Sequence, residues 1–489
     1  MKPLTIFLPL SAPEILEKNL NEFNSSGLIN KIFVLVPRNS SPPIPEGIHT
    51  LEIDTLYSSD TVRKIATHAV TAYALLYIKE QPLSIGPSSL HRMIQVAENT
   101  KSAMIYSDYY SVKDNQTYPS PVIDYQQGSL RDDFNFGPLL FYDTSALRES
   151  ASAMQKDYIY AGIYDLRLKL SQKYQIFHLP EFLYTETETD TRKSGEKQFD
   201  YVNPRNREVQ IEMEKACTDF LKETGAWLEP HFRDVNFNEM DFNTEVSVII
   251  PVKNRVNTIS DAIRSVLSQN TSFTFNLIIA DNHSNDGTTE EIRKFSNDKR
   301  VVHIIPTRTD LGIGGCWNEA ILNETCGKFA VQLDSDDLYI DENVLERIAA
   351  ALYEQKCAMI VGTYRMVNFN LEELPPGIID HREWTPDNGR NNALRINGLG
   401  APRAFYTPVI RSIRFPNVSY GEDYAVGLNI SRFYRIGRIY DPLYLCRRWE
   451  GNSDAALDIQ KLNTYNFYKD KIRTIEYYAR QNYIKNGQT

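Results

Sequence analysis

The sequence lacks the features of a membrane-spanning, disulfide-bonded or nucleic-acid-binding protein. No stretch approaches the roughly 18 consecutive apolar residues that a membrane helix requires. The five cysteines are scattered without any CxxC pair, which favours free thiols in a reducing cytoplasm over a disulfide framework. The net charge is −10 and dense runs of Lys or Arg are absent, so we expect no nucleic-acid partner.

A signal peptide is also not expected. Pro3, Thr5 and Pro9 interrupt the short apolar run at the N-terminus, which predicts a first strand that ends at Pro9. The hydrophobic fraction of 42% and the charged fraction of 24% are those of an ordinary globular chain. A length of 489 residues therefore predicts two or three folded domains.

Strand and helix patterns alternate along most of the chain. The clearest strand, Val246–Ile250, stops at Pro251 and is followed by a helical pattern over Thr258–Leu267. A second strand, Asn276–Ala280, runs into an Asp- and Asn-rich turn. This alternation predicts an α/β fold with mostly parallel sheets flanked by helices.

The first half of the chain repeats short segments of the second half in the same order. Ile6–Pro9 matches Ile249–Pro251, and Ala103–Ile105 matches Ala358–Ile360. Near the end of each half, Leu183–Tyr184 matches Leu443–Tyr444. Because ordered matches are hard to obtain by chance, we predict two tandem copies of one domain.

This duplication predicts the domain organisation. One copy would occupy residues 1–190 and the other residues 244–453, joined by a linker over 191–243 with an amphipathic helix at Asn206–Trp227. Residues 454–489 would form a helical tail that packs its aromatic side chains on the second copy. Contact of this tail with a membrane surface is the alternative.

Three carboxylates follow the apolar strand that ends at Leu333. Asp334, Asp336 and Asp337 stand within four residues, and their charges would repel one another without compensation. Mg²⁺ and Mn²⁺ prefer carboxylate oxygens and readily share their coordination shell with phosphate oxygens. An acidic turn before the helix near Asp341 is the alternative that the residues alone leave open.

Five short segments follow one another over the second half of the chain: VIIPVKNR (248–255), IADNHSNDGT (279–288), LGIGGCWNEA (311–320), LDSDD (333–337) and GED (421–423). In this order they resemble glycosyltransferase family 2, whose members have the GT-A fold. The resemblance covers about residues 245–453, and it implies transfer of a sugar from a nucleotide-sugar to a hydroxyl of a glycan, polysaccharide or lipid-linked acceptor. It favours a UDP-sugar over a GDP-sugar as donor, and Mn²⁺ or Mg²⁺ as cofactor.

The resemblance also assigns roles by position. Asp336 and Asp334 would hold the metal, and Asp423, next to Glu422, would act as the general base of an inverting transfer. Glu422 and Asp423 could instead only cap a helix. The residues implied for donor binding are Pro251, Asn254, Arg255, Asp281, Asn282, Gly312, Gly314, Gly315, Asn318 and Asp334.

Within that set, the three glycines would let the backbone approach the pyrophosphate, and Asn318 would open a helix. Trp449 stands where many family members have a metal-binding His, so the resemblance supplies no third protein ligand there. Arg447 or Arg448 could neutralise the diphosphate, and the glycine-rich segment 398–402 resembles the acceptor-side loop.

The first half lacks the matching carboxylates. By the offsets of the repeated segments, residues 79–82 (KEQP) replace Asp334–Asp337, and Gly162 and Ile163 replace Glu422 and Asp423. We therefore predict a non-catalytic copy over residues 1–190.

Two other functions are compatible with the pattern. A sugar nucleotidyltransferase would normally carry a glycine-rich loop after the first strand, whereas residues 251–255 (PVKNR) contain no glycine. A binding protein without turnover fits the first half better than the second half, which keeps its carboxylates. The expected location is the cytoplasm, with contact at the inner face of the membrane left open.

Overall fold

The computed structural model of the chain describes residues 2–38, 40, 44, 48–190, 206–449, 452 and 457–487. The chain forms two compact units. The first unit combines Met1–Lys193 with Arg207–Trp227 and Leu457–Thr489, and the second is built mainly from Leu228–Ala456. The predicted linker residues 191–205 lie outside the described part, as do Glu450, Gly451 and Ser453.

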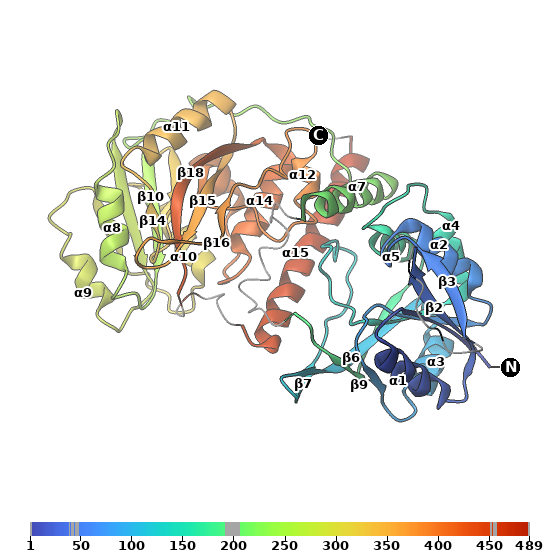
Figure 1. Cartoon of the computed structure of the whole chain (residues 1–489). Coiled ribbons are helices and arrows are strands. Elements are labelled where there is room, and N and C mark those ends of the chain that lie inside the picture. Colours follow the sequence, from blue (N-terminus) through green and yellow to red (C-terminus); the bar gives the residue numbers. More distant parts are fainter. Residues whose placement is uncertain are drawn as a thin grey trace. The chain divides into compact units, whose positions relative to one another are not determined.

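The first unit contains a nine-stranded sheet flanked by helices (Figure 1). The strands lie in the order β3-β2-β1-β4-β8-β6-β9-β5, and β7 pairs with β6. The strands are β1 (Leu4–Pro9), β2 (Ile29–Pro37), β3 (His49–Ile53), β4 (Tyr73–Tyr77), β5 (Leu83–Ile85), β6 (Met104–Lys113), β7 (Gln116–Ser120), β8 (Leu139–Asp143) and β9 (Ile176–Thr187). The helices are α1 (Pro13–Asn24), α2 (Ser59–His68), α3 (Ser89–Thr100), α4 (Thr144–Ser152), α5 (Gly162–Lys173), α7 (Arg207–Glu223) and α15 (Ile459–Lys485).

The second unit contains a nine-stranded sheet with the order β12-β11-β10-β13-β17-β15-β18-β14, and β16 pairs with β15. The strands are β10 (Val246–Val252), β11 (Phe275–Asp281), β12 (Val301–Ile304), β13 (Phe329–Gln332), β14 (Leu338–Tyr339), β15 (Met359–Val367), β16 (Glu373–Ile379), β17 (Arg403–Tyr406) and β18 (Ile436–Arg447). The helices are α8 (Ile259–Leu267), α9 (Thr288–Arg293), α10 (Ile313–Leu322), α11 (Val344–Gln355), α12 (Gly389–Asn392), α13 (Thr407–Ile413) and α14 (Glu422–Phe433).

The two sheets have the same strand order and the same pattern of strand directions, which confirms the predicted α/β fold and its duplication. β1 corresponds to β10 and β4 to β13, as the sequence predicts. In each sheet the first four strands of the order run parallel, and the next strand runs against them. β6 pairs parallel with β9, and β15 pairs parallel with β18.

The strand register corrects the predicted match of the acidic turn by one residue. β4 begins opposite Leu4 of β1, and β13 begins opposite Val246 of β10. With Pro9 and Pro251 as matching strand ends, Asp336 corresponds to Glu80. Most positions in both inner strands are buried on either face, so their apolar runs carry no alternation from which the register could be predicted. The first half therefore keeps one of the three carboxylates, on an exposed side chain.

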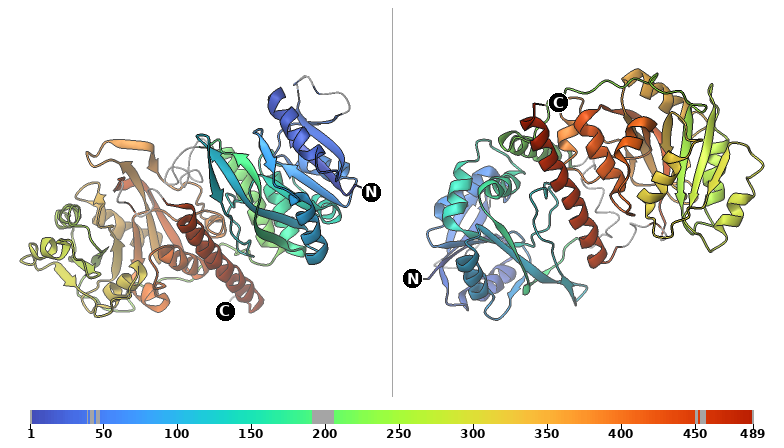
Figure 2. Two further views of the ribbon diagram at one scale, coloured as in Figure 1. Left: turned by 90° about the horizontal axis from the view of Figure 1, so that it is seen from below. Right: turned by 180° about the vertical axis from the view of Figure 1, so that it is seen from behind.

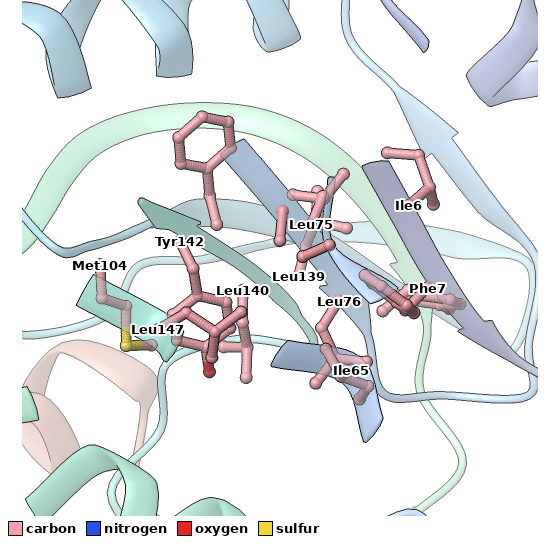
Figure 3. Packing of buried hydrophobic residues seen from close by; sticks show 14 of the residues in the cluster. Ile6, Phe7, Ile65, Leu75, Leu76, Met104, Leu139, Leu140, Tyr142 and Leu147 are labelled. Carbon is pink, nitrogen blue, oxygen red and sulfur yellow. The ribbon is translucent and has the colours of Figure 1, made fainter. Parts of the chain in front are cut away.

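The core of the first unit is formed where β1, β4 and β8 meet α2 and α4 (Figure 3). Phe7, Leu76 and Leu140 from the sheet lie near Ile65 of α2 and Leu147 of α4, and all five side chains are buried. Burying a side chain of this size contributes roughly 1.5–3 kcal/mol. The first unit thus has its own apolar core, although it lacks most of the carboxylates that the acidic turn of the second unit carries.

The C-terminal helix α15 packs on the first unit, and the prediction that it packs on the second copy is wrong. Asp470 of α15 pairs with Arg131 at 3.3 Å, and Gln481 Nε2 donates to the carbonyl of Thr224 at 2.7 Å. The aromatic composition predicted a helix correctly, but composition does not identify which surface receives it. Among the described helices, none combines the length and apolarity needed to cross a membrane.

Candidate active site

The acidic residues of the second unit gather at one edge of its sheet. β10, β11 and β13 run parallel, so the segments that follow Val252, Asp281 and Gln332 leave the sheet on the same side. β17 runs antiparallel to β13, which brings its first residue, Arg403, to this edge. Ligands of open α/β sheets bind at the carboxyl ends of such strands.

The acidic turn after β13 holds its carboxylates at different depths. Asp334 and Asp336 are partly exposed, whereas Asp337 is buried and accepts a hydrogen bond from the Arg447 backbone N–H at 2.7 Å. Burial raises the pKa of Asp337 well above its usual value, and the charges of Asp336 and Asp334 raise it further. The turn therefore retains the mutual repulsion that a bound cation would relieve.

Asp336 is held by residues from the end of β18. Its Oδ2 accepts hydrogen bonds from Trp449 Nε1 and Asn452 Nδ2, both at 3.2 Å. Arg255 Nε lies 3.9 Å from the same oxygen, and the Arg447 side chain donates to the Asp336 carbonyl. Trp449 cannot ligate a metal, but its indole N–H fixes the orientation of a predicted metal ligand. Sequence reasoning did not identify this role.

Asp423 forms an ion pair with a residue that the sequence did not single out. Arg403 Nη1 lies 2.6 Å from Asp423 Oδ2 and donates to the Gly400 carbonyl at 2.9 Å. The Arg403 backbone N–H donates to Gln332 Oε1, and Gln332 Nε2 donates to Asp334 Oδ1 at 2.8 Å. A chain of hydrogen bonds thus joins the predicted base to the acidic turn. The signal that could have revealed Arg403 is a charged residue directly before the apolar segment 404–406.

The charges of Arg403 and Asp423 both act on the carboxyl group of Asp334. Burial raises the pKa of Asp334, Arg403 lowers it, and the charges of Asp336 and Asp423 raise it again. The structure therefore brings together Asp334, Asp336 and Asp423, as predicted.

Glu422 occupies the first turn of α14, but it faces the interior. Its side chain is buried, and within the described residues its Oε2 has no hydrogen-bond partner. Burial raises the pKa of Glu422, and the neighbouring charge of Asp423 adds to the effect. Asp423 keeps a quarter of its side chain exposed, so it is the member of the pair that can meet a ligand.

The glycine-rich start of α10 contacts the segment that leads into α14. A Cβ on Gly314 would lie 2.0 Å from the Pro416 carbonyl oxygen, and one on Gly315 would lie 2.3 Å from Asn417 Oδ1. The N–H groups of Gly312 and Gly314 donate to Asn417 Oδ1 and the Val418 carbonyl. These donors, which we expected to face a pyrophosphate, are used within the chain. The glycines instead allow the close approach of residues 416–418.

Asn318 of α10 also binds the segment that leads into α14. Its Nδ2 donates to the Phe415 carbonyl at 2.8 Å, and its Oδ1 accepts from the Phe415 backbone N–H at 2.9 Å. Residues 415–418 are therefore fixed on α10, a few residues before Glu422 and Asp423. The predicted glycine motif positions the acidic pair.

The loop after β10 is bound to the loop after β11. Asn254 has a positive φ of 55°, and its backbone N–H donates to Ser284 Oγ at 2.9 Å. The Arg255 backbone N–H donates to Thr288 Oγ1 at 2.7 Å. Pro251, at the end of β10, is half-buried. These contacts fix the predicted nucleotide-binding residues at the same edge as the acidic turn.

Asp281 is buried beneath this loop. Its carboxylate accepts from the Ser284 backbone N–H at 3.0 Å, from Thr289 Oγ1 at 2.5 Å and from His303 Nε2 at 3.4 Å. Burial alone would raise the pKa of Asp281, but these hydrogen bonds outweigh it and hold the pKa well below its usual range. Asp281 has no exposed surface, so in this structure it orders the loop and does not face an open pocket.

Asn282 is held beside Asp281. Its Nδ2 donates to the Leu311 carbonyl at 2.8 Å, and its buried Oδ1 has no hydrogen-bond partner among the described residues. Arg447 is likewise buried, and its Nη1 pairs with Asp261 of α8 at 3.1 Å. Arg447 therefore ties the acidic turn to α8, and its charge is already compensated.

The donor chemistry of the acidic turn fits a divalent cation with few protein ligands. No group of three or more His, Cys, Asp or Glu side chains in the described residues is arranged to hold a metal. Asp334 and Asp336 offer two partly exposed carboxylates beside the buried Asp337, and Mg²⁺ or Mn²⁺ can complete such a shell with phosphate oxygens and water. The residues present therefore fit a cation that arrives together with a diphosphate.

Sequence comparison gives the following matches. The family model described as Glycosyl transferase family 2 matches residues 247–416. The Escherichia coli glucosyltransferase WfgD, which by name uses UDP-Glc and α-D-GlcNAc-diphosphoundecaprenol, is 33% identical over 125 residues, which are 26% of this chain and 47% of WfgD. TuaG of Bacillus subtilis, named as a glycosyltransferase of teichuronic acid biosynthesis, is 30% identical over 186 residues, which are 38% of this chain and 71% of TuaG.

Two solved structures show a partial likeness. Staphylococcus aureus TarS 1–349 in complex with UDP-GlcNAc is 21% identical, with a TM-score of 0.38 over 48% of this chain and 72% of that chain. The Pyrobaculum calidifontis mannosyltransferase PcManGT in complex with GDP-Man and Mn²⁺ is 14% identical, with a TM-score of 0.34 over 55% of this chain and 83% of that chain. The chain spans about half the length of WfgD and about a quarter of two uncharacterised Rickettsia glycosyltransferases that it also matches.

Proposed function

The chain belongs to glycosyl transferase family 2, and we propose that it transfers a sugar from a nucleoside-diphosphate donor to an acceptor hydroxyl. The observation that carries the proposal is the network at the sheet edge, in which Arg403 pairs with Asp423 and is linked through Gln332 to Asp334. This network joins a carboxylate suited to proton removal with a turn suited to a metal diphosphate.

In the proposed reaction Asp423 accepts the proton of the acceptor hydroxyl. The acceptor oxygen forms its bond to the anomeric carbon while the bond from that carbon to the diphosphate oxygen breaks. Arg403 holds the Asp423 carboxylate in one orientation through the 2.6 Å ion pair. Proton removal by a positioned base accelerates such reactions about 10²–10⁴-fold. Attack opposite the leaving group inverts the anomeric configuration.

The donor diphosphate is proposed to bind beside the acidic turn. Asp334 and Asp336 would hold Mn²⁺ or Mg²⁺, which when bound neutralises the charge that develops on the leaving nucleoside diphosphate. Arg255, 3.9 Å from Asp336, would add positive charge on the same side. Asn254 and Pro251 would line the nucleotide pocket.

The donor and acceptor classes come from the relatives. WfgD is named for a UDP-Glc donor and an α-D-GlcNAc-diphosphoundecaprenol acceptor, and TuaG is named as a putative glycosyltransferase of teichuronic acid biosynthesis. We therefore favour a UDP-sugar donor and a glycan or lipid-linked acceptor for this chain. A cytoplasmic location remains a prediction from the five free cysteines.

The first half is proposed to be non-catalytic. At the start of its helix α5, which corresponds to α14, the backbone N–H groups of Ile159, Tyr160 and Ala161 donate to the Glu212 carboxylate at 2.7–3.2 Å. A carboxylate of α7 thus takes the donors at the place where the second unit carries its acidic pair. This arrangement supports a structural or acceptor-docking role.

The proposal is tested by screening UDP- and GDP-sugars for thermal stabilisation and transfer with Mn²⁺ or Mg²⁺. Asp336→Ala should abolish transfer and metal-dependent stabilisation by the donor, while the unfolding temperature without ligand stays within a few degrees. Glu80→Ala, at the corresponding position of the first unit, is the matched control and should change neither. Full transfer in excess chelator, or equal activity of Asp336→Ala, would show that the metal-diphosphate assignment is wrong.

A further inference from the structure

Helix α15 is a long helix, drawn in dark red in Figure 2, and its faces differ in burial. It has 27 residues, so it extends over about 40 Å. The helix packs on the first unit, and a continuous part of its surface is buried. The buried residues recur at the spacing of one helix face and are mainly charged: Lys469, Asp470, Ile472, Arg473, Glu476, Tyr477 and Arg480.

Contacts with two parts of the first unit, the segment 128–131 and helix α7, fix the position of α15. Ser129 Oγ donates to Asp470 Oδ2 at 3.1 Å, and Arg131 pairs with the same carboxylate. Gly128 lies so close that a Cβ there would be 2.1 Å from the Thr474 nitrogen. The ring of Tyr477 stacks on Phe220 of α7, with 6.0 Å between the ring centroids. The orientation of α15 about its own axis is therefore set, and the opposite face is left at the surface.

The opposite face carries lysines and apolar side chains. Every residue on it is exposed, and the residues follow one another at intervals of three or four positions. Ile475 is 63% exposed and Tyr478 50% exposed, which are high values for such side chains. The outward face consists of Lys461, Thr464, Phe467, Lys471, Ile475, Tyr478, Asn482 and Lys485.

The charge of the outward face is opposite to that of the chain. The whole chain has a net charge of −10, yet the eight outward positions hold three lysines and no Asp or Glu. The acidic residues nearest to its centre, Asp470 and Glu476, are buried and paired with Arg473 and Arg480. The face therefore offers unopposed positive charge to a partner.

We propose that the outward face of α15 lies on an anionic membrane surface. A bilayer surface is extended and negatively charged, which matches a face of about 40 Å that carries a lysine at each end and one near its middle, with apolar residues between them. Lysine stems can lie along the interface with their ammonium groups toward lipid phosphates, while Phe467, Ile475 and Tyr478 enter the headgroup region. The proposal deepens the proposed function, because it places the enzyme at the surface that holds a lipid-linked acceptor.

Vesicle flotation tests the proposal without any transfer reaction. The 489-residue chain should float with phosphatidylcholine vesicles that contain 30% phosphatidylglycerol and should not float with phosphatidylcholine alone. Lys461→Gln, Lys471→Gln and Lys485→Gln combined should weaken binding about 100-fold, at about 1 kcal/mol for each lysine. The matched control changes three exposed lysines elsewhere on the first unit, Lys2, Lys18 and Lys31, to Gln, and should bind as the unmodified chain does.

A second variant distinguishes insertion of apolar side chains into the headgroup region from electrostatic attraction alone. Ile475→Ser with Tyr478→Ser should weaken binding about tenfold, and this loss should persist when the salt concentration is raised. Equal binding of the two lysine variants would overturn the proposal. So would unmodified protein that ignores anionic vesicles, or an outward face that mediates a dimer in light scattering. Donor-induced thermal stabilisation, measured in the same variants, should be unchanged, so loss of vesicle binding is distinguishable from failure of the proposed function.

Discussion

Trp449→Phe tests whether Trp449 orients Asp336 for a cation. The substitution removes the indole N–H, which donates to Asp336 Oδ2 at 3.2 Å, and keeps a ring against Phe369, whose centroid lies 5.5 Å from that of Trp449. A hydrogen bond to a charged group contributes roughly 1.5–3 kcal/mol. Because the bond is long and Asn452 still donates to the same oxygen, we expect the low end of this range. Mn²⁺ affinity should therefore fall about tenfold.

The affinity is best measured by titrating Mn²⁺ in the presence of UDP, with the free ion followed by electron paramagnetic resonance. Trp449→His is the informative companion, because an imidazole nitrogen can ligate the ion directly and should tighten binding. Thermal denaturation without metal checks that both variants fold as the unmodified chain does. If Trp449→Phe bound Mn²⁺ as tightly as the unmodified chain, the indole would have no role in orienting Asp336, and tighter binding would show that the indole competes with the cation; either result would refute the argument for orientation.

Three further substitutions probe other parts of the second and first units. Asp423→Asn should lower turnover by about 100-fold or more with donor affinity nearly unchanged, because the amide cannot accept the proton of the acceptor hydroxyl. Loss of donor affinity with normal turnover of bound donor would instead show that Asp423 binds the donor. Gly314→Ala should destabilise the second unit by about 1–3 kcal/mol and lower turnover, because its Cβ would lie 2.0 Å from the Pro416 carbonyl oxygen; an unchanged unfolding temperature would contradict this contact. Burial raises the pKa of Asp165 to about 6, so the folded state favours the protonated carboxyl group. The stability that protonated Asp165 contributes is therefore fully present below pH 4 and is lost as the pH rises through 6. Asp165→Asn cannot ionise, and calorimetry should show a smaller loss of stability between pH 4 and 7 than in the unmodified chain, whereas identical pH curves would exclude this group as the cause.

The sequence predicted most of the architecture because the inner strands are strongly apolar and end at recognisable residues. The strand at Ile6–Pro9 and the strand at Val248–Pro251 occupy the same place in their sheets. The one-residue shift at Glu80 was beyond sequence reasoning, since β4 and β13 are both almost wholly buried. Periodicity fixes a register only where one face of a strand is polar.

For the candidate site, the sequence predicted the acidic residues but not what holds them. Asp334, Asp336 and Asp423 stand out because they follow apolar strands or open a helix. Arg403 does not stand out, since a single arginine at the start of a strand is common, and its role depends on the antiparallel pairing that brings it to Asp423. The glycines of α10 were assigned to a ligand because nothing in a sequence shows which distant segment will pack against a helix end.

The discontinuous first unit has a consequence for synthesis of the chain. Leu228–Ala456 is continuous and is fully available once residue 456 has left the ribosome, whereas the first unit also needs α15, which follows the second unit in the sequence. Until then Arg131, whose side chain is 4% exposed in the finished structure, has its ion pair with Asp133 but not the one with Asp470, and the surface that α15 covers is open to water. Synthesis of the first unit therefore starts before that of the second unit and finishes after it, so a nascent chain truncated before α15 should contain an unfinished first unit and a finished second unit.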